Sequence, residues 1–152
     1  MAMSKETIEK WIDEIGVSII SSVDELGFPN TKAMLPPRKR EGILSFYFTT
    51  NTSSMRVKHY HSNYKACIYF FDQRLFRGVM LLGTMEVLID QKTKDMLWQD
   101  GDTMYYPLGV TDPDYCVLKF SAKQMRIYQN FKSENIDIKI FGNYPTVWLI
   151  QN

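Results

Sequence analysis

One stretch of the chain runs from an apolar strand, through hydroxyl and amide side chains, into a helix; it reads Phe46-Tyr47-Phe48-Thr49-Thr50-Asn51-Thr52-Ser53-Ser54-Met55-Arg56-Val57. The first amides of a helix have no partner within the helix, and they lie at the positive end of the helix dipole. Arg56 adds a planar, charged donor in the first turn of this helix. Together these groups favour a site for a terminal phosphate.

A structural interpretation of the same residues stays open at this point. Serine and threonine are ordinary caps at a helix start, and an arginine in the first turn is common. Lys32, in the preceding strand, supports the phosphate interpretation. If that strand pairs antiparallel with the strand over residues 43–50, Lys32 comes close to the corner between Thr49 and Arg56. The alternative for Lys32 is a solvated position on a strand edge.

Outward from this corner, the patterns predict six strands and three helices. An amphipathic helix over residues 4–15 has Ser4 as a cap and Gly16 as a stop. Strands are predicted over residues 17–23, 30–35, 43–50, 64–71, 76–90 and 116–128, and further helices from residue 53 or 54 to 62 and over 92–99. Gly78 and Gly83 in the fifth strand indicate bends. The prediction is a mostly β domain with flanking helices, built on a six-stranded antiparallel split β-barrel.

The length of 152 residues predicts a single domain over 1–152, with the barrel core at about 17–128 and a tail over 130–152 whose pattern is ambiguous. A formal charge of +1 argues against nucleic-acid binding. The sequence offers neither an apolar run of membrane-spanning length nor a signal peptide, so we expect no membrane partner and a cytoplasmic protein. Cys67 and Cys116 are interpreted as buried, reduced thiols, and no metal site is predicted.

The order of the motifs resembles the FMN-binding split-barrel family, which includes pyridoxamine phosphate oxidases and general-stress flavin proteins. The pieces that carry the resemblance are Val23-Asp24-Glu25-Leu26-Gly27-Phe28-Pro29, Lys32-Ala33-Met34, Phe46-Tyr47-Phe48-Thr49-Thr50, Ser54-Met55-Arg56-Val57, Asn63 and the strand containing Gly83. Tyr106-Pro107-Leu108-Gly109, Asp112-Pro113-Asp114 and Val117-Leu118-Lys119-Phe120 look like the stress-protein branch. The resemblance covers roughly residues 8–128, and its specificity comes from order and spacing rather than from any single motif.

The resemblance implies FMN as the cofactor, held at the subunit interface of a homodimer. It assigns Lys32 and Arg56 to the phosphate as cations, with Ser54 and Thr50 as hydroxyl donors. The backbone of further residues would follow the flavin ring and the ribityl chain. The full predicted cofactor-binding set is Lys32, Ala33, Met34, Tyr47, Phe48, Thr49, Thr50, Ser54, Met55 and Arg56.

The same resemblance argues against pyridoxamine phosphate oxidation. The Arg-x-His substrate motif of those oxidases has no counterpart, since His59 and His61 are the only histidines and no arginine follows Arg126. The first hypothesis is an FMN-dependent oxidoreductase that acts on an unidentified small molecule, with no catalytic residue assigned. A flavin-binding or flavin-sensing stress protein without turnover is one alternative, and a related barrel that binds haem or a deazaflavin is another.

Several residues keep two interpretations. Both histidines are expected to lie exposed on the helix; they would be the only histidine ligands for a haem. Trp98, Tyr105 and Tyr106 fit a wall of the flavin site and an interface or core position equally well. Asp112 and Asp114 are explained by a turn before a strand.

Overall fold

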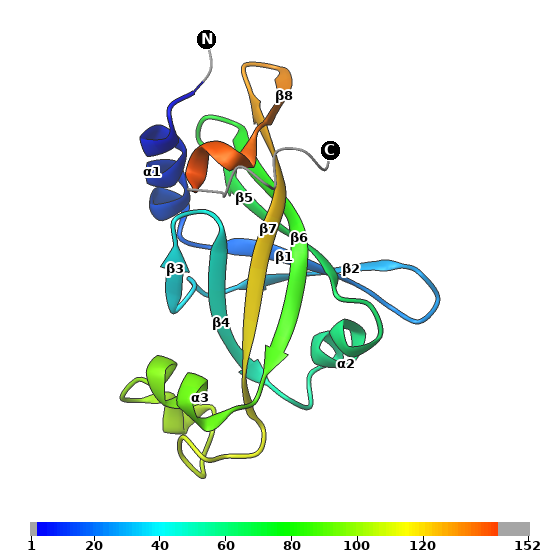
Figure 1. Cartoon of the computed structure of the whole chain (residues 1–152), viewed down its shortest axis with the longest axis vertical. Coiled ribbons are helices and arrows are strands. Elements are labelled where there is room, and N and C mark those ends of the chain that lie inside the picture. The colour runs from blue at the N-terminus through cyan, green and yellow to red at the C-terminus, as the bar shows by residue number, and fades with distance from the viewer. Residues whose placement is uncertain (1–2, 143–152) are drawn as a thin grey trace.

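The computed structural model describes residues 3–142, and these form one antiparallel eight-stranded sheet coiled into a split barrel with three α-helices around it (Figure 1). The elements in chain order are α1 (Lys5–Ile15), β1 (Ser18–Val23), β2 (Pro29–Met34), β3 (Lys39–Glu41), β4 (Ser45–Asn51), α2 (Met55–Ser62), β5 (Lys65–Asp72), β6 (Arg77–Leu88), α3 (Gln91–Leu97), the 3-10 helix η1 (Asp102–Met104), β7 (Tyr115–Gln129), β8 (Lys132–Ile136) and the 3-10 helix η2 (Ile138–Phe141). The sheet order is β2-β1-β5-β6-β7-β4-β3, and β8 pairs with β7.

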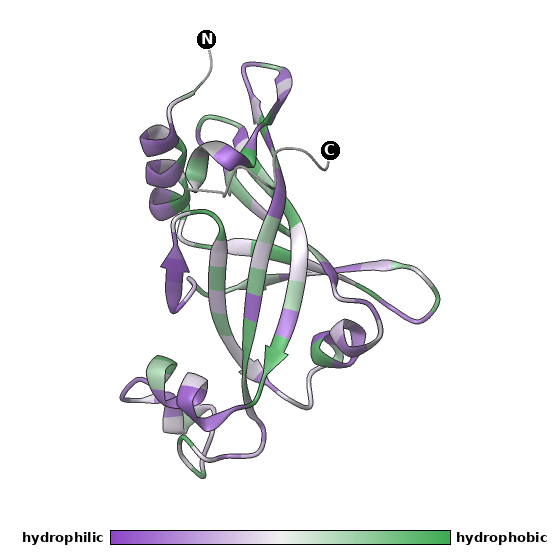
Figure 2. Cartoon of the chain, viewed as in Figure 1, coloured by the Kyte–Doolittle hydropathy of each residue, from purple (hydrophilic) through white to green (hydrophobic). Residues whose placement is uncertain are grey.

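The first helix forms as its sequence predicts. The Ser4 side chain accepts a hydrogen bond from the backbone N–H of Thr7, and Gly16 ends the helix with a positive φ of 72°. Ile8, Trp11 and Ile12 are buried against the barrel. The opposite side of α1 is hydrophilic (Figure 2), so the helix closes one side of the barrel with a single apolar stripe.

One cluster of buried apolar side chains fills the interior of the barrel, and a second lies beneath α3. Strand β4 contributes side chains to both clusters. Phe46 and Phe48 point into the barrel, where the ring centroids of Phe46 and Phe70 are 5.6 Å apart. Tyr47, between them in sequence, points the other way and packs with Tyr115 in the second cluster. Because successive side chains of a strand alternate between its faces, one short strand joins the barrel core to the α3 region.

The long strands β6 and β7 bend at a bulge. Their register shifts between Leu82 and Gly83, and Gly83 lies against the backbone of Ser121 and the ring of Phe120. The expected bend at Gly83 is therefore present, and it has a packing cause: a side chain at this position would occupy the space of the neighbouring strand.

The prediction of six strands is wrong in number, although the fold class is confirmed. The two additional strands are β3, which pairs with β4, and β8, which pairs with β7. All residues of β3 are charged and β8 is mostly exposed, so neither shows alternation. The turn before β8 uses Asn130 and Phe131 at positive φ, without the glycine that normally marks such a turn.

Part of the predicted tail is now assigned, because residues 132–141 form β8 and η2. The ends of the predicted 1–152 domain, residues 1–2 and 143–152, lie outside the described residues. The two cysteines are free, with Cys116 buried and Cys67 only half-buried. No helix in the described part of the chain is long and apolar enough to cross a membrane.

We expect the fold to lose stability at high pH because of two buried tyrosines, Tyr60 and Tyr115. Burial raises the pKa of Tyr60 and of Tyr115 to about 12, and their hydroxyls donate to the carbonyls of Ser21 and Lys94. Their ordinary pKa is 10.0, so the folded chain retains these protons more tightly than the unfolded chain. The stabilisation of the fold by these two protonated tyrosines is fully present below pH 10. It is lost as the pH rises towards 12, and the free energy of unfolding falls by roughly 1 kcal/mol per pH unit for each tyrosine.

Denaturant unfolding curves measured across this range check the expectation. A Tyr60→Phe variant should show a shallower fall of the unfolding free energy with pH than the wild type. Equal slopes for the two proteins would contradict the assignment to Tyr60.

Candidate functional site

A pocket of about 230 Å³ lies where β2, β4, the start of α2 and the loop after η1 meet. Its lining residues are Lys32, Ala33, Met34, Leu35, Pro36, Arg38, Phe48, Thr49, Thr50, Asn51, Arg56, Tyr105 and Tyr106. Seven of them belong to the set predicted from the sequence: Lys32, Ala33, Met34, Phe48, Thr49, Thr50 and Arg56. The coiled sheet thus brings most of the predicted residues around one cavity.

The way in which Lys32 reaches this pocket differs from the expectation. Strand β2 pairs only with β1 in the described sheet, with Lys32 opposite Ile20, while β4 pairs with β3 and β7. The two strands are not neighbours in hydrogen bonding. The sheet coils until β2, at one end of the strand order, comes close to β4, and the pocket lies between them.

At one end of the pocket, Arg56 and Ser54 present polar atoms that nothing in the described chain satisfies. Arg56 Nη2 donates to Thr50 Oγ1 at 3.0 Å, whereas Arg56 Nε is buried without a partner. Ser54 is the N-cap residue of α2, yet its side chain makes no capping bond, and its Oγ is also buried without a partner. Buried polar groups are nearly always paired, so these atoms mark a place for an acceptor from outside the chain.

This end of the pocket is also positively charged. Lys32 and Arg56 both line the cavity, and within residues 3–142 neither of them forms an ion pair with a carboxylate. Two cations, two hydroxyls and the amino end of α2 together suit an oxyanion such as a phosphate. We call Lys32, Thr50, Ser54 and Arg56 the anion corner.

The loop that leads into the anion corner is held by Asp114. Its carboxylate accepts hydrogen bonds from Asn51 Nδ2 and from the backbone N–H of Ser53, both at 2.8 Å. The Asn51 contact, followed by those to Ser53, lowers the pKa of Asp114. The interpretation of residues 112–114 as a turn is therefore right, and Asp114 in addition orients the loop before α2.

Arg38, another residue of the pocket lining, forms an ion pair with Asp102. Arg38 Nη2 lies 2.6 Å from Asp102 Oδ1, and the second oxygen of Asp102 accepts from the backbone N–H of Gln99. Arg38 Nη1 is buried and has no hydrogen-bond partner among residues 3–142. The two residues are separated by 64 positions in the sequence, so this pair is a product of the tertiary fold.

The aromatic residues that the sequence left open divide between the two roles. Tyr105 and Tyr106 line the pocket, whereas Trp98 packs behind them, 5.3 Å from Tyr115 and 6.2 Å from Tyr106 between ring centroids. Burial raises the pKa of Tyr106, so its hydroxyl stays neutral at physiological pH. The wall of the pocket therefore presents neutral rings to a bound molecule.

Three predicted residues are not on the pocket lining. Tyr47 points into the cluster beneath α3, and its carbonyl accepts from the N–H of Arg38 at 2.8 Å. Ser54 lies beside the lining as the cap of α2. Met55 is exposed and borders a smaller neighbouring cavity of about 180 Å³, which shares Lys32 and Arg56 with the first.

The lining contains four residues that sequence reasoning did not propose: Leu35, Pro36, Arg38 and Asn51. Asn51 stood in the polar run before α2, and this was a usable signal. Leu35 and Pro36 directly follow the predicted Lys32-Ala33-Met34 segment, so the resemblance stopped just short of them. No local sequence pattern could indicate that Arg38 belongs to the site, because its partner Asp102 lies in a loop 64 positions further along the chain.

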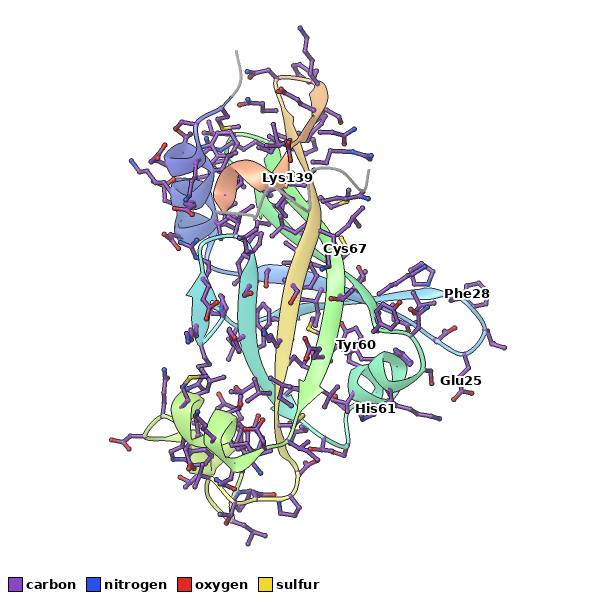
Figure 3. The ribbon with its side chains drawn as sticks, in the orientation of Figure 1. Glu25, Phe28, Tyr60, His61, Cys67 and Lys139 are labelled. Carbon is purple, nitrogen blue, oxygen red and sulfur yellow. The ribbon has the colours of Figure 1, made fainter. Side chains whose placement is uncertain are left out.

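The expectation that both histidines are exposed is wrong for His59. His59 is buried, and its Nδ1 lies 2.8 Å from Ser22 Oγ, a contact that fastens α2 to β1. His61 is exposed on α2 (Figure 3). Within residues 3–142 there is no group of three or more His, Cys, Asp or Glu side chains that could hold a metal ion.

Comparisons with known proteins place these features in a family. The model of the pyridoxamine 5'-phosphate oxidase family matches residues 4–129. The solved structure of a Clostridium acetobutylicum protein related to general stress protein 26 of Bacillus subtilis is 36% identical, covers 92% of this chain and 100% of its own, and superposes with a TM-score of 0.82.

More distant structures share the fold. An FMN-binding, pyridoxamine 5'-phosphate oxidase-related protein from Nostoc punctiforme is 14% identical, with a TM-score of 0.67 and coverage of 90% of this chain and 100% of its own. A heme-binding protein from Mycobacterium smegmatis is 12% identical, with a TM-score of 0.71 and coverage of 93% and 61%. No curated protein matched the chain. On the family match and the 36% identity, the chain belongs to the pyridoxamine 5'-phosphate oxidase family.

Proposed function

We propose that this chain binds FMN in the pocket between β2 and β4 and acts, as a cytoplasmic homodimer, as an oxidoreductase on a small molecule. The observation that carries the proposal is the anion corner, where two cations without an acidic partner in the described chain and two buried polar atoms without a hydrogen-bond partner there lie in or beside the pocket. The family includes an FMN-binding member, which makes the terminal phosphate of FMN the natural occupant.

The residues present fit this cofactor. Lys32 and Arg56 supply charge to the phosphate, and the phosphate oxygens would accept the hydrogen bonds that Ser54 Oγ and Arg56 Nε do not make within the described chain. Tyr105 and Tyr106 line the same cavity, and Tyr105, at 52% exposed, offers aromatic surface to a bound molecule. When bound, FMN carries the redox chemistry, and the chain contributes position, electrostatics and exclusion of water.

The dimer is proposed from the size and the rim of the pocket. The cavity of about 230 Å³ is smaller than the roughly 300–1,000 Å³ of typical ligand pockets. Leu35, Met55 and Tyr105, at or beside its rim, are 68%, 72% and 52% exposed. The β1–β2 hairpin projects from the barrel with the exposed Phe28 near its tip (Figures 1 and 3). A second copy would cover these apolar surfaces and complete the site.

The reaction proposed is not pyridoxamine phosphate oxidation, because the chain has no histidine after His61 and no arginine after Arg126. A flavin-binding stress protein without turnover is the second candidate. It is favoured by the lining of the described pocket, which contains no carboxylate and no histidine to act as an acid or a base. The two free thiols fit the reducing environment of the cytoplasm in either case.

An absorbance spectrum after gel filtration tests the proposal. Purified protein incubated with excess FMN should retain the visible flavin bands in the protein peak, with one FMN per chain, and the peak should elute as a dimer. Protein that emerges colourless would contradict FMN binding, and a Soret band in protein from its own host would indicate haem instead. With the FMN-loaded protein, steady reduction of a candidate substrate at the expense of NAD(P)H or dithionite would separate an oxidoreductase from a flavin carrier.

A further inference from the structure

We propose that Arg38 binds a neutral carbonyl oxygen of a planar molecule in the pocket, at a place separate from the anion corner. This inference rests on the proposed function, since it assigns the remaining polar contact of the same site. The shared chemistry is a ring carbonyl, which FMN or a substrate of the holoprotein can supply.

Arg38 has an N–H donor that no group in the described chain accepts. A guanidinium carries five N–H donors and no acceptor. Arg38 Nη2 donates to Asp102 Oδ1 at 2.6 Å. Arg38 lines the pocket, and its Nη1 is buried with no partner in the described chain. Leaving such a donor unpaired is costly, so a bound molecule with an acceptor oxygen at this place is stabilised.

The ion pair with Asp102 determines which charge the acceptor should carry. The Asp102 side chain is only 4% exposed and directly neutralises the guanidinium. The surroundings of Arg38 therefore carry little net charge, whereas Lys32 and Arg56 in the anion corner have no acidic partner within residues 3–142. A full negative charge is favoured at the anion corner, and a neutral carbonyl is favoured at Arg38.

The lining of the pocket determines which shape of bound molecule fits. Tyr105, which is 52% exposed, and Tyr106 line the same cavity as Arg38, and aromatic side chains favour planar ligands. The backbone N–H of Arg38 donates to the carbonyl of Tyr47, which places Arg38 beside the middle of β4. Phe48, its neighbour there, is two residues before Thr50, or about 7 Å along the strand. The pocket therefore suits a molecule whose anionic group and carbonyl edge are well separated.

The test removes the pair together, because Arg38→Met alone would leave Asp102 buried without its cation. The double variant Arg38→Met/Asp102→Asn avoids this, and its thermal unfolding shows whether it is folded. Arg40→Met is the matched control, since Arg40 lies two residues away and pairs with Asp13 at 2.7 Å outside the pocket. The measurements are the Kd for FMN, the midpoint potential of the bound flavin and the Kd of the holoprotein for menadione, a small neutral quinone.

If the carbonyl belongs to the flavin, the double variant should bind FMN about tenfold or more weakly, on the scale of one charged hydrogen bond. Its flavin should also have a more negative potential, because a donor to a ring carbonyl stabilises the electron-rich reduced form. If the carbonyl belongs to a substrate, FMN binding stays as in the wild type and the affinity for menadione falls instead. The control should change none of these values.

Unchanged values for FMN and menadione in the folded double variant would overturn the inference and leave the proposed function standing. A wild-type protein that retains no FMN would overturn the proposed function. Menadione binding to the wild type and to the double variant would then decide the role of Arg38, with equal affinities overturning it and a loss in the variant supporting it.

Discussion

Replacing Arg56 with alanine is expected to weaken FMN binding by about 2 kcal/mol or more, which corresponds to a rise in Kd of about thirtyfold or more. Arg56 contributes a charge without an acidic partner in the described chain, the Nη2 contact to Thr50 at 3.0 Å and a buried Nε that has no other partner. Removing it leaves Lys32 as the only cation of the anion corner. Titration of the apoprotein with FMN, followed by quenching of flavin fluorescence, measures the change.

Two comparisons make this experiment specific to the phosphate. Riboflavin lacks the phosphate, so its affinity should be nearly the same for the wild type and the variant. Lys58→Ala removes a cation from the same helix, but Lys58 is exposed and pairs with Glu25 at 3.2 Å, away from the pocket. It should bind FMN like the wild type. An Arg56→Ala variant with wild-type affinity for FMN would remove Arg56 from the phosphate role.

Replacing Gly83 with alanine is expected to destabilise the fold by about 3 kcal/mol or more, at the upper end of the cost of overpacking a core. A Cβ at this position would collide with the carbonyl oxygen of Ser121 and would lie 2.9 Å from the ring of Phe120. The colliding oxygen belongs to the backbone of β7, which is hydrogen-bonded on both sides, to β4 and to β6. It cannot move aside without opening the register at the bulge.

Gly78→Ala is the matched control, because it adds the same methyl group to the same strand. The atoms that it would meet belong to the far end of the Tyr69 side chain, which can rotate away. We expect a melting temperature several degrees lower for Gly83→Ala than for Gly78→Ala, at roughly 2–4 °C for each kcal/mol. Similar melting temperatures for the two variants would show that the bulge has more room than its contacts indicate.

Local patterns were sufficient for most of the secondary structure. The helical spacing of Ile8, Trp11 and Ile12 and the caps at Ser4 and Gly16 predicted α1 almost to the residue. Alternation predicted β4, β5 and β7, because each of these strands buries one face more deeply than the other. Where burial does not alternate, as in the charged β3 and the exposed β8, the sequence carried no signal and the strands were missed.

Three of the four residues of the anion corner could be predicted to lie together from their spacing alone. Thr50, Ser54 and Arg56 lie within seven positions, so the turn from β4 into α2 brings them together without help from distant segments. Lys32 lies close to these three residues only because the sheet coils. Arg38 contacts Asp102 only because the loop after α3 returns to the barrel. His59 is buried for a similar reason, since Ser22 on β1 lies beneath α2. Contacts within one turn depend on local backbone geometry and can be read from spacing, whereas contacts between distant segments depend on how the whole sheet curves, which no local pattern encodes.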